Sequence, residues 1–280
     1  GFAASTLPSP PTTPFVEPLP IAPIARPVPP FATLPDSSTL NSDGSSALHV
    51  HGPRVVPPGA EYYLIEEKPT LHSFHPQLPM SSLWGYCGSV PGPTFISTSG
   101  TASLIRFKNQ LPEFDPVGIG EPISAIHHHG GFQAPEDDGY PLDTFGPGQS
   151  RDYLIPNIPE EGLSQNETST TWYHDHAIDT TAENVYRGLA GFYLNFDDID
   201  SYLGEEDRSA KALRLPGRMR ESADGSRFRD YDIPIVIQDK RFDSRGTLVY
   251  NSFDHNGFIG DKLLANGKIQ PFLRVDKRKY

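Results

Sequence analysis

The sequence predicts an all-β chain, folded as a β-sandwich or a small barrel. Short stretches rich in β-branched and aromatic residues recur along it, and turns rich in glycine and proline separate them. Only one short helix is expected, over residues 181–189 (TAENVYRGL). Hydrophobic residues make up 36% of the 280 residues, which is low for a single compact globule and points to extended segments outside the core.

The first of these segments is the N-terminal stretch, residues 1–59. Its first 35 residues hold 11 of the 30 prolines. Proline lacks the amide hydrogen and fixes φ, so neither a helix nor a central strand is expected there. We predict an extended segment that drapes over a folded body or stays mobile, followed by a loop rich in serine, glycine and proline.

Residues 60–198 have the strand-like composition expected of the β-sandwich itself. The expected strands share alternating or β-rich composition and lie at 61–67, 101–109, 150–157, 170–177 and 190–198. Turns are expected at PGP (91–93), at GPG (146–148) and after the histidine-rich stretch near residue 128. This spacing predicts one complete β domain.

The remaining residues divide into a linker and the start of a second β unit. Residues 199–230 are charged and irregular, which is typical of a linker. Strands are expected at 233–242 and 246–253, and Asn266-Gly267 predicts a hairpin turn. The unit at 231–280 is too short for a complete sandwich of about 100 residues, so we expect only its first strands.

Two His-X-His pairs carry the chemistry. His127 and His129 lie in AIHHHGG, and His174 and His176 lie in TWYHDHA. Alternate residues of a strand point to one face, roughly 6.5–7 Å apart, so two neighbouring strands would present four nitrogen ligands together. Imidazole suits copper, zinc, iron and nickel, and the pairs alone therefore do not name the metal.

The residues between and outside these pairs have other expected roles. His128 and Asp175, each in the middle of a pair, should point to the opposite face of their strands. A third pair, His49 and His51, lies in loop-like sequence beside Pro53 and is interpreted as a chance occurrence.

A mononuclear cupin-type enzyme also uses His-X-His on strands, but it places a glutamate about four residues later. Here Glu136 follows His129 by seven, which disfavours a cupin.

Charge and hydropathy exclude some classes of partner. Lys and Arg number 23 and Asp and Glu 35, a net charge of −12, which disfavours nucleic acid and anionic membranes as partners. No apolar run approaches the ~20 residues that span a bilayer. We expect a secreted, extracellular protein, and the sequon Asn166-Glu167-Thr168 permits N-glycosylation there.

The surrounding motifs resemble multicopper oxidases, in the branch of bilirubin oxidase and spore-coat laccase. The resemblance is carried by HHHGG, an acidic stretch ending in DDG, and WYHDHA followed by TAENVYRGLAGFY. PLPIAP, LWGYCGSVPGPTF at 83–95 and the terminal LLANGKIQPFLRVDKRKY agree in order, so the match runs from about residue 18 to 280. It implies a cupredoxin-like Greek-key β-sandwich plus the first strands of a second such domain.

The resemblance also implies site roles and an activity. His127 would bind a type 2 copper, and His129, His174 and His176 would bind type 3 coppers of a trinuclear cluster. Asp138, which precedes Gly139, matches the acidic residue that delivers protons during dioxygen reduction. The activity implied is oxidation of a phenolic or tetrapyrrole-type reductant, one electron at a time, with O2 reduced to water.

This chain lacks half of the histidines that bind the family's trinuclear cluster. Eight histidines hold the family's trinuclear cluster, and the C-terminal motifs that supply the other four and the type 1 copper site are not in the sequence. Cys87 lacks the flanking histidines of a type 1 ligand and is expected to be a buried or paired thiol. We therefore expect a companion C-terminal polypeptide, or the remainder of the same protein, to complete the site. The alternative is a non-enzymatic copper-binding or coat protein of the same fold.

Overall fold

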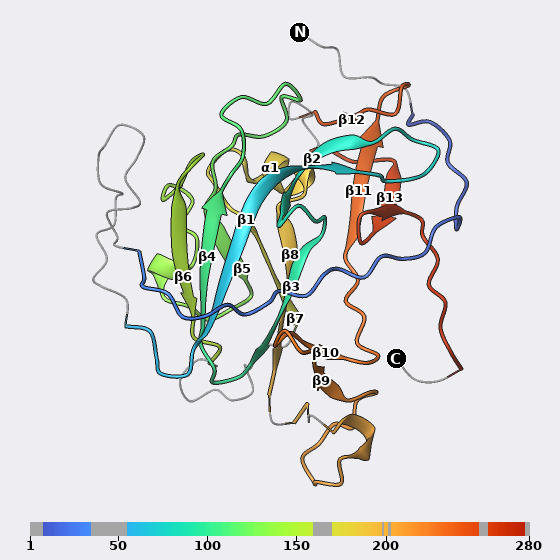
Figure 1. The fold of residues 1–280 in the computed structure, drawn as a ribbon. Helices are drawn as coiled ribbons and strands as arrows, with labels where there is room; N and C mark the ends of the chain where they lie inside the picture. Colours follow the sequence, from blue (N-terminus) through green and yellow to red (C-terminus); the bar gives the residue numbers. More distant parts are fainter. Residues whose placement is uncertain are drawn as a thin grey trace.

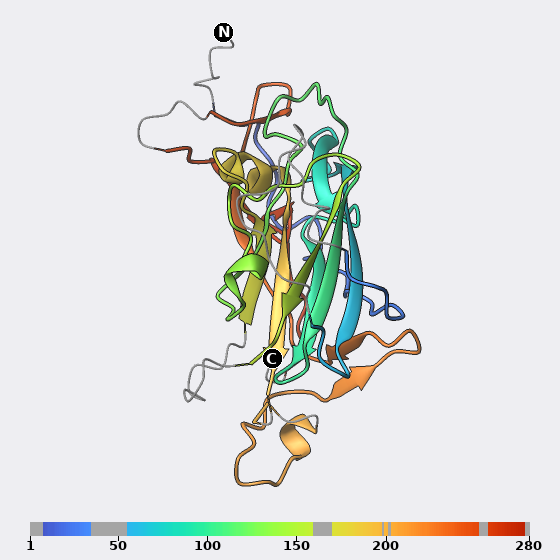
Figure 2. The same ribbon diagram turned by 90° about the vertical axis from the view of Figure 1, so that its left-hand side faces the viewer.

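Two four-stranded sheets face each other and form a β-sandwich, as Figures 1 and 2 show. The computed structural model describes residues 8–34, 55–158, 170–197, 199–200, 203–251 and 257–277. The first sheet has the order β2-β1-β4-β6 and contains β1 (Glu61–His72), β2 (Ser81–Tyr86), β4 (Ser103–Asn109) and β6 (Ser150–Ile155). The second has the order β3-β8-β7-β5 and contains β3 (Gly92–Thr98), β5 (Ile126–His129), β7 (Thr170–Asp175) and β8 (Ala190–Phe196).

The all-β prediction is confirmed, with two separate sheets in place of a barrel. Five expected strands correspond to β1, β4, β6, β7 and β8. β1 runs parallel to β4 and β3 runs parallel to β8, so the chain crosses between sheets instead of forming only hairpins. Strands β2 and β3 were not expected, and β3 begins inside the predicted PGP turn, at Gly92.

Aromatic side chains fill the space between the two sheets. Trp84, Tyr86, Phe107 and Tyr173 are all nearly inaccessible to solvent and belong to one cluster. Their rings meet edge-on or tilted, with centroids 5.5 Å apart for Tyr86 and Phe107 and 5.0 Å apart for Tyr86 and Tyr173. Burying such a side chain contributes roughly 1.5–3 kcal/mol, so this core holds both sheets in a fixed relation.

The expected helix is α1 (Thr181–Arg187), which leads from β7 into β8. Its last residue, Arg187, is fully buried, with its guanidinium 4.2 Å from the centre of the Trp84 ring. Arg187 also pairs with Asp115 and donates to the carbonyl of Ile119 at 2.8 Å. The helix is therefore fixed against the end of the sandwich near the start of β5.

A smaller sheet packs beside the sandwich and corresponds to the second β unit. It has the order β12-β11-β13-β14 and contains β11 (Ile237–Phe242), β12 (Leu248–Val249), β13 (Lys262–Ala265) and β14 (Lys268–Ile269). The turn predicted at Asn266-Gly267 joins β13 to β14, with φ of 47° and 80° at the two residues. Phe242 and Leu264 pack with Phe74 and Leu83 of the sandwich side in one buried cluster.

The predicted linker contains a hairpin that the sequence did not indicate. Strands β9 (Met219–Glu221) and β10 (Arg227–Arg229) pair antiparallel. The linker also contains the 3-10 turn η4 (Gly204–Glu206), whereas the 3-10 turn η2 (Pro135–Asp137) follows β5. Arg227 reaches Glu61 of β1 with Nη2–Oε1 at 2.6 Å. The domain boundaries themselves stay a prediction.

The described part of the N-terminal segment packs along the folded body. Of the two alternatives predicted, draped or mobile, the structure shows the first for residues 8–34. Within residues 8–34 the amide of Leu19 donates to Phe272, that of Ala25 to Thr94 and that of Val28 to Tyr62. The segment thus runs from the smaller sheet onto the sandwich (Figure 1). The chance pair His49 and His51 lies outside the described residues.

The prediction for Cys87 is wrong, because its thiol is exposed and unpaired. Cys87 has φ of 54° and sits in the tight turn after β2. Its amide donates to Glu66 at 2.6 Å, so the backbone is held inward while the side chain points out. The chain has no other cysteine with which it could pair.

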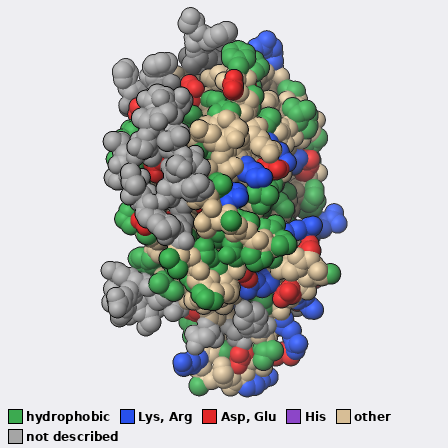
Figure 3. Space-filling model, turned by 60° about the vertical axis from the view of Figure 1, so that its left-hand side comes forward, with side chains coloured by type: hydrophobic (Ala, Val, Ile, Leu, Met, Phe, Trp, Pro, Cys, Tyr) green, Lys and Arg blue, Asp and Glu red, His purple; other side chains and the backbone are tan. Residues whose placement is uncertain are grey.

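No helix among the described residues is both long and apolar enough to cross a bilayer. Figure 3 shows one face of the molecule, on which hydrophobic, acidic and basic side chains are interspersed. The negative net charge therefore does not appear there as a patch of a single sign. The sequon at Asn166 lies outside the described residues.

Candidate metal centre

Strands β5 and β7 bring the two His-X-His pairs together. They pair antiparallel, with His127 directly opposite His174 and His129 opposite Trp172. His176 follows β7, and its amide donates to the carbonyl of Ala125, just before β5, at 2.6 Å. The pairing thus spreads the four predicted histidines along the short β5–β7 ladder, from His129 at one end to His176 just beyond the other.

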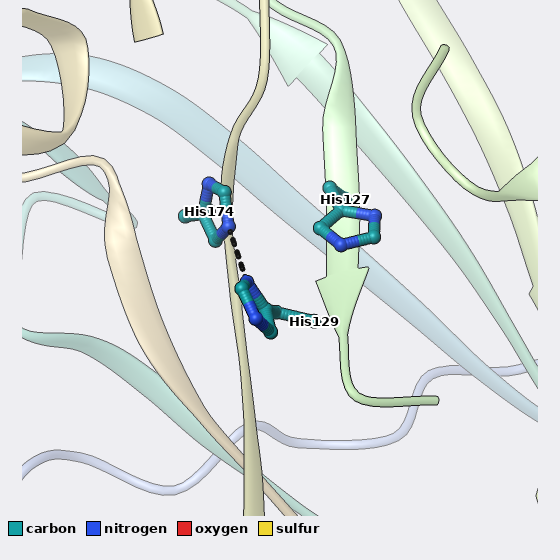
Figure 4. Close-up of side chains that lie close together, drawn as sticks. All are labelled: His127, His129 and His174. Atoms are coloured by element: carbon teal, nitrogen blue, oxygen red, sulfur yellow. Dashed lines mark hydrogen bonds between the residues drawn. The ribbon is translucent and has the colours of Figure 1, made fainter. Parts of the chain in front are cut away.

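The four imidazole rings form one cluster. The ring centre of His127 lies 5.3 Å from that of His129, 5.4 Å from His174 and 5.1 Å from His176. Ligand nitrogens of His127, His129 and His174 all lie within 4.8 Å of one another. Figure 4 shows these three rings turned toward a common space between the strands.

The donor set fits copper. All four donors are imidazole nitrogens, which copper accepts readily, and no carboxylate ligand of the kind preferred by magnesium or calcium is among them. The Nδ1 of His176 is buried and lacks a hydrogen-bond partner within the described residues. A buried polar atom of this kind is costly unless something satisfies it, and a bound metal would do so.

Backbone carbonyls orient two of the rings. The Nδ1 of His127 lies 2.6 Å from the carbonyl oxygen of Asp138, and the Nδ1 of His174 lies 2.6 Å from that of Asp175. A carbonyl only accepts, so each Nδ1 carries the hydrogen and each Nε2 is unprotonated, with a lone pair that a metal could accept. The Nε2 of His174 lies 3.2 Å from the Nδ1 of His129 (dashed in Figure 4).

Burial keeps His174 uncharged. Together with the neighbouring rings of His127, His129 and His176 it lowers the pKa of His174 to about 4, although the hydrogen bond to the carbonyl of Asp175 acts in the opposite direction. A metal binds only the unprotonated nitrogen. His174 is therefore neutral, and available for a metal, over the whole physiological pH range.

Asp138, to which the resemblance assigns proton delivery, lies beside the cluster. Its Oδ1 is 3.1 Å from the Nδ1 of His127, and its side chain is 50% exposed. The next residue, Gly139, has φ of +72°, and a Cβ there would stand 2.3 Å from the carbonyl oxygen of Ile126. Only glycine allows this loop to lie directly on β5, which brings Asp138 to His127.

The middle residues of the two motifs face the other way, also as expected. His128 is buried, its Nε2 is 2.7 Å from Thr171 Oγ1, and burial lowers its pKa to about 4. Asp175 accepts from the amides of Ala125 and Ala177 and from the Nδ2 of Asn184. Burial raises the pKa of Asp175 to about 7 despite these bonds. Asp175 therefore ties β5, β7 and α1 together beneath the cluster.

Sequence reasoning missed three side chains around the site. Trp172 stacks on His129 with ring centres 5.0 Å apart, and the strand period that paired the histidines would have placed it on the same face. Gln133 contacts Asp138, and Arg151 donates to the carbonyls of Asp143 and Glu136. Neither of these two had a signal in the sequence, because their contacts arise from how a loop folds back on the sheet.

The other described histidines are separate from the cluster. The Nε2 of His72 lies 2.6 Å from the carbonyl of Gly267, and the Nε2 of His75 lies 2.9 Å from that of Thr13. Both rings therefore join the sandwich to neighbouring segments.

The chain is similar to several known proteins. Residues 72–197 match the family model of the multicopper oxidase domain. Bilirubin oxidase from Albifimbria verrucaria is 35% identical over 78% of this chain and 32% of its own length. A laccase from Bacillus stratosphericus is 32% identical over 80% of this chain and 45% of its own length. The solved laccase from Pediococcus acidilactici shares the fold, with a TM-score of 0.63 and 23% identity over 94% of this chain and 44% of that one.

The relatives carry more than one name. Cell division protein FtsP from Shigella dysenteriae is 30% identical over 70% of this chain and 34% of its own length. The chain thus spans less than half the length of these relatives. Residues 72–197 are therefore similar to a multicopper oxidase domain, and the chain is similar to the N-terminal part of bilirubin oxidase and laccases.

Proposed function

We propose that the chain is the N-terminal part of a multicopper oxidase that oxidises a phenolic or tetrapyrrole-type reductant and reduces O2 to water. The observation that carries the proposal is the cluster of His127, His129, His174 and His176 on and beside β5 and β7, in which ligand nitrogens of the first three lie within 4.8 Å of one another. Copper bound there would take up single electrons and pass them to dioxygen. His127 would serve a type 2 copper and the other three would serve type 3 coppers.

The chain's own residues support this role in two ways. The carbonyls of Asp138 and Asp175 fix the hydrogens of His127 and His174 on Nδ1, so that each Nε2 is unprotonated and could bind a metal. The Asp138 carboxylate touches His127 on one side and solvent on the other. A group in that position can take a proton from water and hold it beside the centre where oxygen is reduced.

The proposal requires ligands from beyond these 280 residues. Four histidines are half of the eight that the family's cluster takes, and we propose that a companion polypeptide, or the remainder of the same protein, supplies the rest together with a type 1 copper. An exposed apolar surface that includes Trp172, whose ring stacks on His129, supports this: Trp172 is 36% exposed, Ile235 48% and Ile237 66%. They line a hollow of about 570 Å³ between β7, β8 and β11. We also propose that the protein is secreted and glycosylated at Asn166.

A second candidate is a non-enzymatic copper-binding or structural protein of the same fold. The similarity to proteins named for cell division favours it. Such a protein would hold copper without consuming oxygen. The histidine cluster could hold copper in either candidate, so oxygen uptake distinguishes them.

Oxygen uptake by the full protein tests the proposal. With copper and a phenolic reductant present, we expect uptake with water as the product, and loss of uptake in His127→Ala and His174→Ala. His75→Ala is the control, because His75 lies outside the cluster. Copper binding without any uptake of oxygen would contradict the oxidase and support the second candidate. Mass spectrometry of the intact sample shows whether a companion polypeptide is present.

A further inference from the structure

Gln133 lies between β5 and the carboxylate that the proposed function uses. Its Nε2 donates to the backbone carbonyl of His128 at 3.0 Å and to Asp138 Oδ1 at 2.5 Å. An amide NH2 has two hydrogens, and here each has an acceptor. Both donors of Gln133 are thus committed, one to the strand and one to the loop.

The same carboxylate oxygen faces the cluster. Asp138 Oδ1, the atom that accepts from Gln133, also lies 3.1 Å from the Nδ1 of His127. The Asp138 side chain is 50% exposed, so packing alone does not fix its rotamer. A hydrogen bond to a carboxylate is stronger than one between neutral groups, and Gln133 supplies one that pulls the side chain toward β5.

The turn is shaped to hold Gln133 in this position. A Cβ on Gly131 would stand 2.5 Å from Gln133 Oε1 and 2.3 Å from His128 Nδ1. The absence of a side chain at Gly131 therefore leaves room for the Gln133 amide to face the His128 ring. Gln133 is half-buried in this turn, whereas Gln110, which also donates to a carboxylate, lies on the surface with its Nε2 3.1 Å from Glu66 Oε1.

We propose that Gln133 is a positioning residue, whose amide holds the Asp138 carboxylate against His127. The inference rests on the proposed function for the importance of Asp138, but the positioning itself is a matter of geometry. Gln133 contacts no ligand nitrogen and acts only through Asp138. Its loss should therefore leave copper content unchanged and lower turnover.

Three variants of the full protein test the inference: Gln133→Leu, Asp138→Asn and the two combined. Misplacing a reacting group by about 1 Å can cost on the order of a hundredfold in rate, and we expect Gln133→Leu to lower kcat by roughly 10- to 100-fold with little change in KM for the reductant. In the Asp138→Asn background the same change should alter kcat by less than about twofold, since coupled residues are not additive. Equal losses in both backgrounds would show that Gln133 does not act through Asp138.

A donor restored by other means should rescue the defect. Gln133→Lys keeps a hydrogen-bond donor at the end of a longer side chain, and we expect it to recover more turnover than Gln133→Leu. Gln110→Leu is the matched control, because it removes a glutamine that donates to a carboxylate far from the histidines. A loss in Gln110→Leu as large as in Gln133→Leu would overturn the inference.

A crystal structure of Gln133→Leu separates this inference from the proposed function. We expect the Asp138 carboxylate to leave its place beside the Nδ1 of His127 while the four histidines stay where they are. A carboxylate that keeps its position overturns the inference, whatever the activity. If Asp138→Asn turns over normally, the assigned role of Asp138 fails, and the crystal structure alone decides whether Gln133 positions it. Should Gln133→Leu not fold, Gln133→Asn, with a shorter amide, takes its place in each measurement.

Discussion

At the level of single residues, the two-residue repeat of a β-strand predicted which side chains of the site share a face, and composition did not. Because alternate residues share a face, the sequence alone placed the four histidines together and assigned His128 and Asp175 to the opposite side. The carbonyls that orient His127 and His174 could not be predicted. One of them belongs to Asp138, eleven residues away along a loop, and only the folded loop brings it to the ring.

Replacing Asp138 tests whether its carboxylate delivers protons. In Asp138→Asn we expect copper content to stay as in the wild type and turnover to fall by roughly a hundredfold or more, since a positioned acid or base contributes that much. An amide has nearly the same shape but cannot carry a proton to the centre. Oxygen uptake and copper analysis on the same sample measure both properties.

Glu136→Gln is the control for that variant. Glu136 lies in the same loop, and its carboxylate is replaced by the same isosteric change, so its turnover should match the wild type. Normal turnover in Asp138→Asn, or an equal loss in both variants, would count against a proton-delivering role.

At the scale of elements, the strands with clear alternation were predicted and those with glycine and proline were not. β3 begins at Gly92, between two prolines that signalled a turn, and it is held by pairing with β8, which is distant in sequence. β9 and β10 are short and charged and are fixed by contacts such as Arg227 with Glu61. Such elements depend on tertiary contacts that local composition does not encode.

A substitution at Gly139 tests whether the close approach of the Asp138 loop to β5 matters. In Gly139→Ala the added Cβ would stand 2.3 Å from the carbonyl oxygen of Ile126, so the loop must move away from β5. We expect a loss of stability of about 1–3 kcal/mol, from backbone strain and the displaced contact, together with a loss of turnover. Chemical denaturation and oxygen uptake measure the two effects.

Gly100→Ala separates the clash from the backbone conformation. Gly100 has φ of +81°, close to that of Gly139, but nothing lies within 4 Å of an added Cβ. It should lose stability to a smaller extent and keep full turnover. Matching behaviour of the two variants would mean that the close approach of the loop to β5 does not matter for the site.

At the scale of the whole molecule, the sequence predicted the parts but not how they pack together. The hairpin at Asn266-Gly267 and the draped N-terminal segment were expected from local rules. The packing of the smaller sheet on the sandwich was not, because it depends on side chains such as Phe242 and Phe74 that are far apart in sequence. One contact across this junction involves a buried lysine, Lys240 of β11, whose Nζ donates to the carbonyl of Tyr186 in α1.

Lys240 should make stability depend on pH. Burial lowers its pKa to about 7 from the ordinary 10.5, with Asp239 opposing the shift. Between these two pKa values Lys240 is protonated in the unfolded chain but not in the folded chain. The free energy of unfolding therefore decreases as pH falls toward 7. Between pH 9 and pH 7 the decline is on the order of 2–3 kcal/mol, at 1.36 kcal/mol per pKa unit.

Urea denaturation of Lys240→Met at pH 7, 8 and 9 checks this prediction. The variant should lack the decline, so that its stability relative to the wild type is highest at pH 7. Lys262→Met is the control, since Lys262 is the cross-strand neighbour of Lys240 on β13. Wild-type and Lys240→Met curves that run parallel across this range would contradict the buried, uncharged lysine.

In the proposed function, four histidines on and beside β5 and β7 hold copper. Anomalous diffraction at the copper edge, on crystals of the full protein, locates the metal directly. The predicted result is copper within coordination distance, about 2 Å, of His127, His129, His174 and His176, with further histidines from outside these 280 residues completing the site. Copper bound elsewhere in the protein, with these four rings unligated, would contradict the proposed copper site.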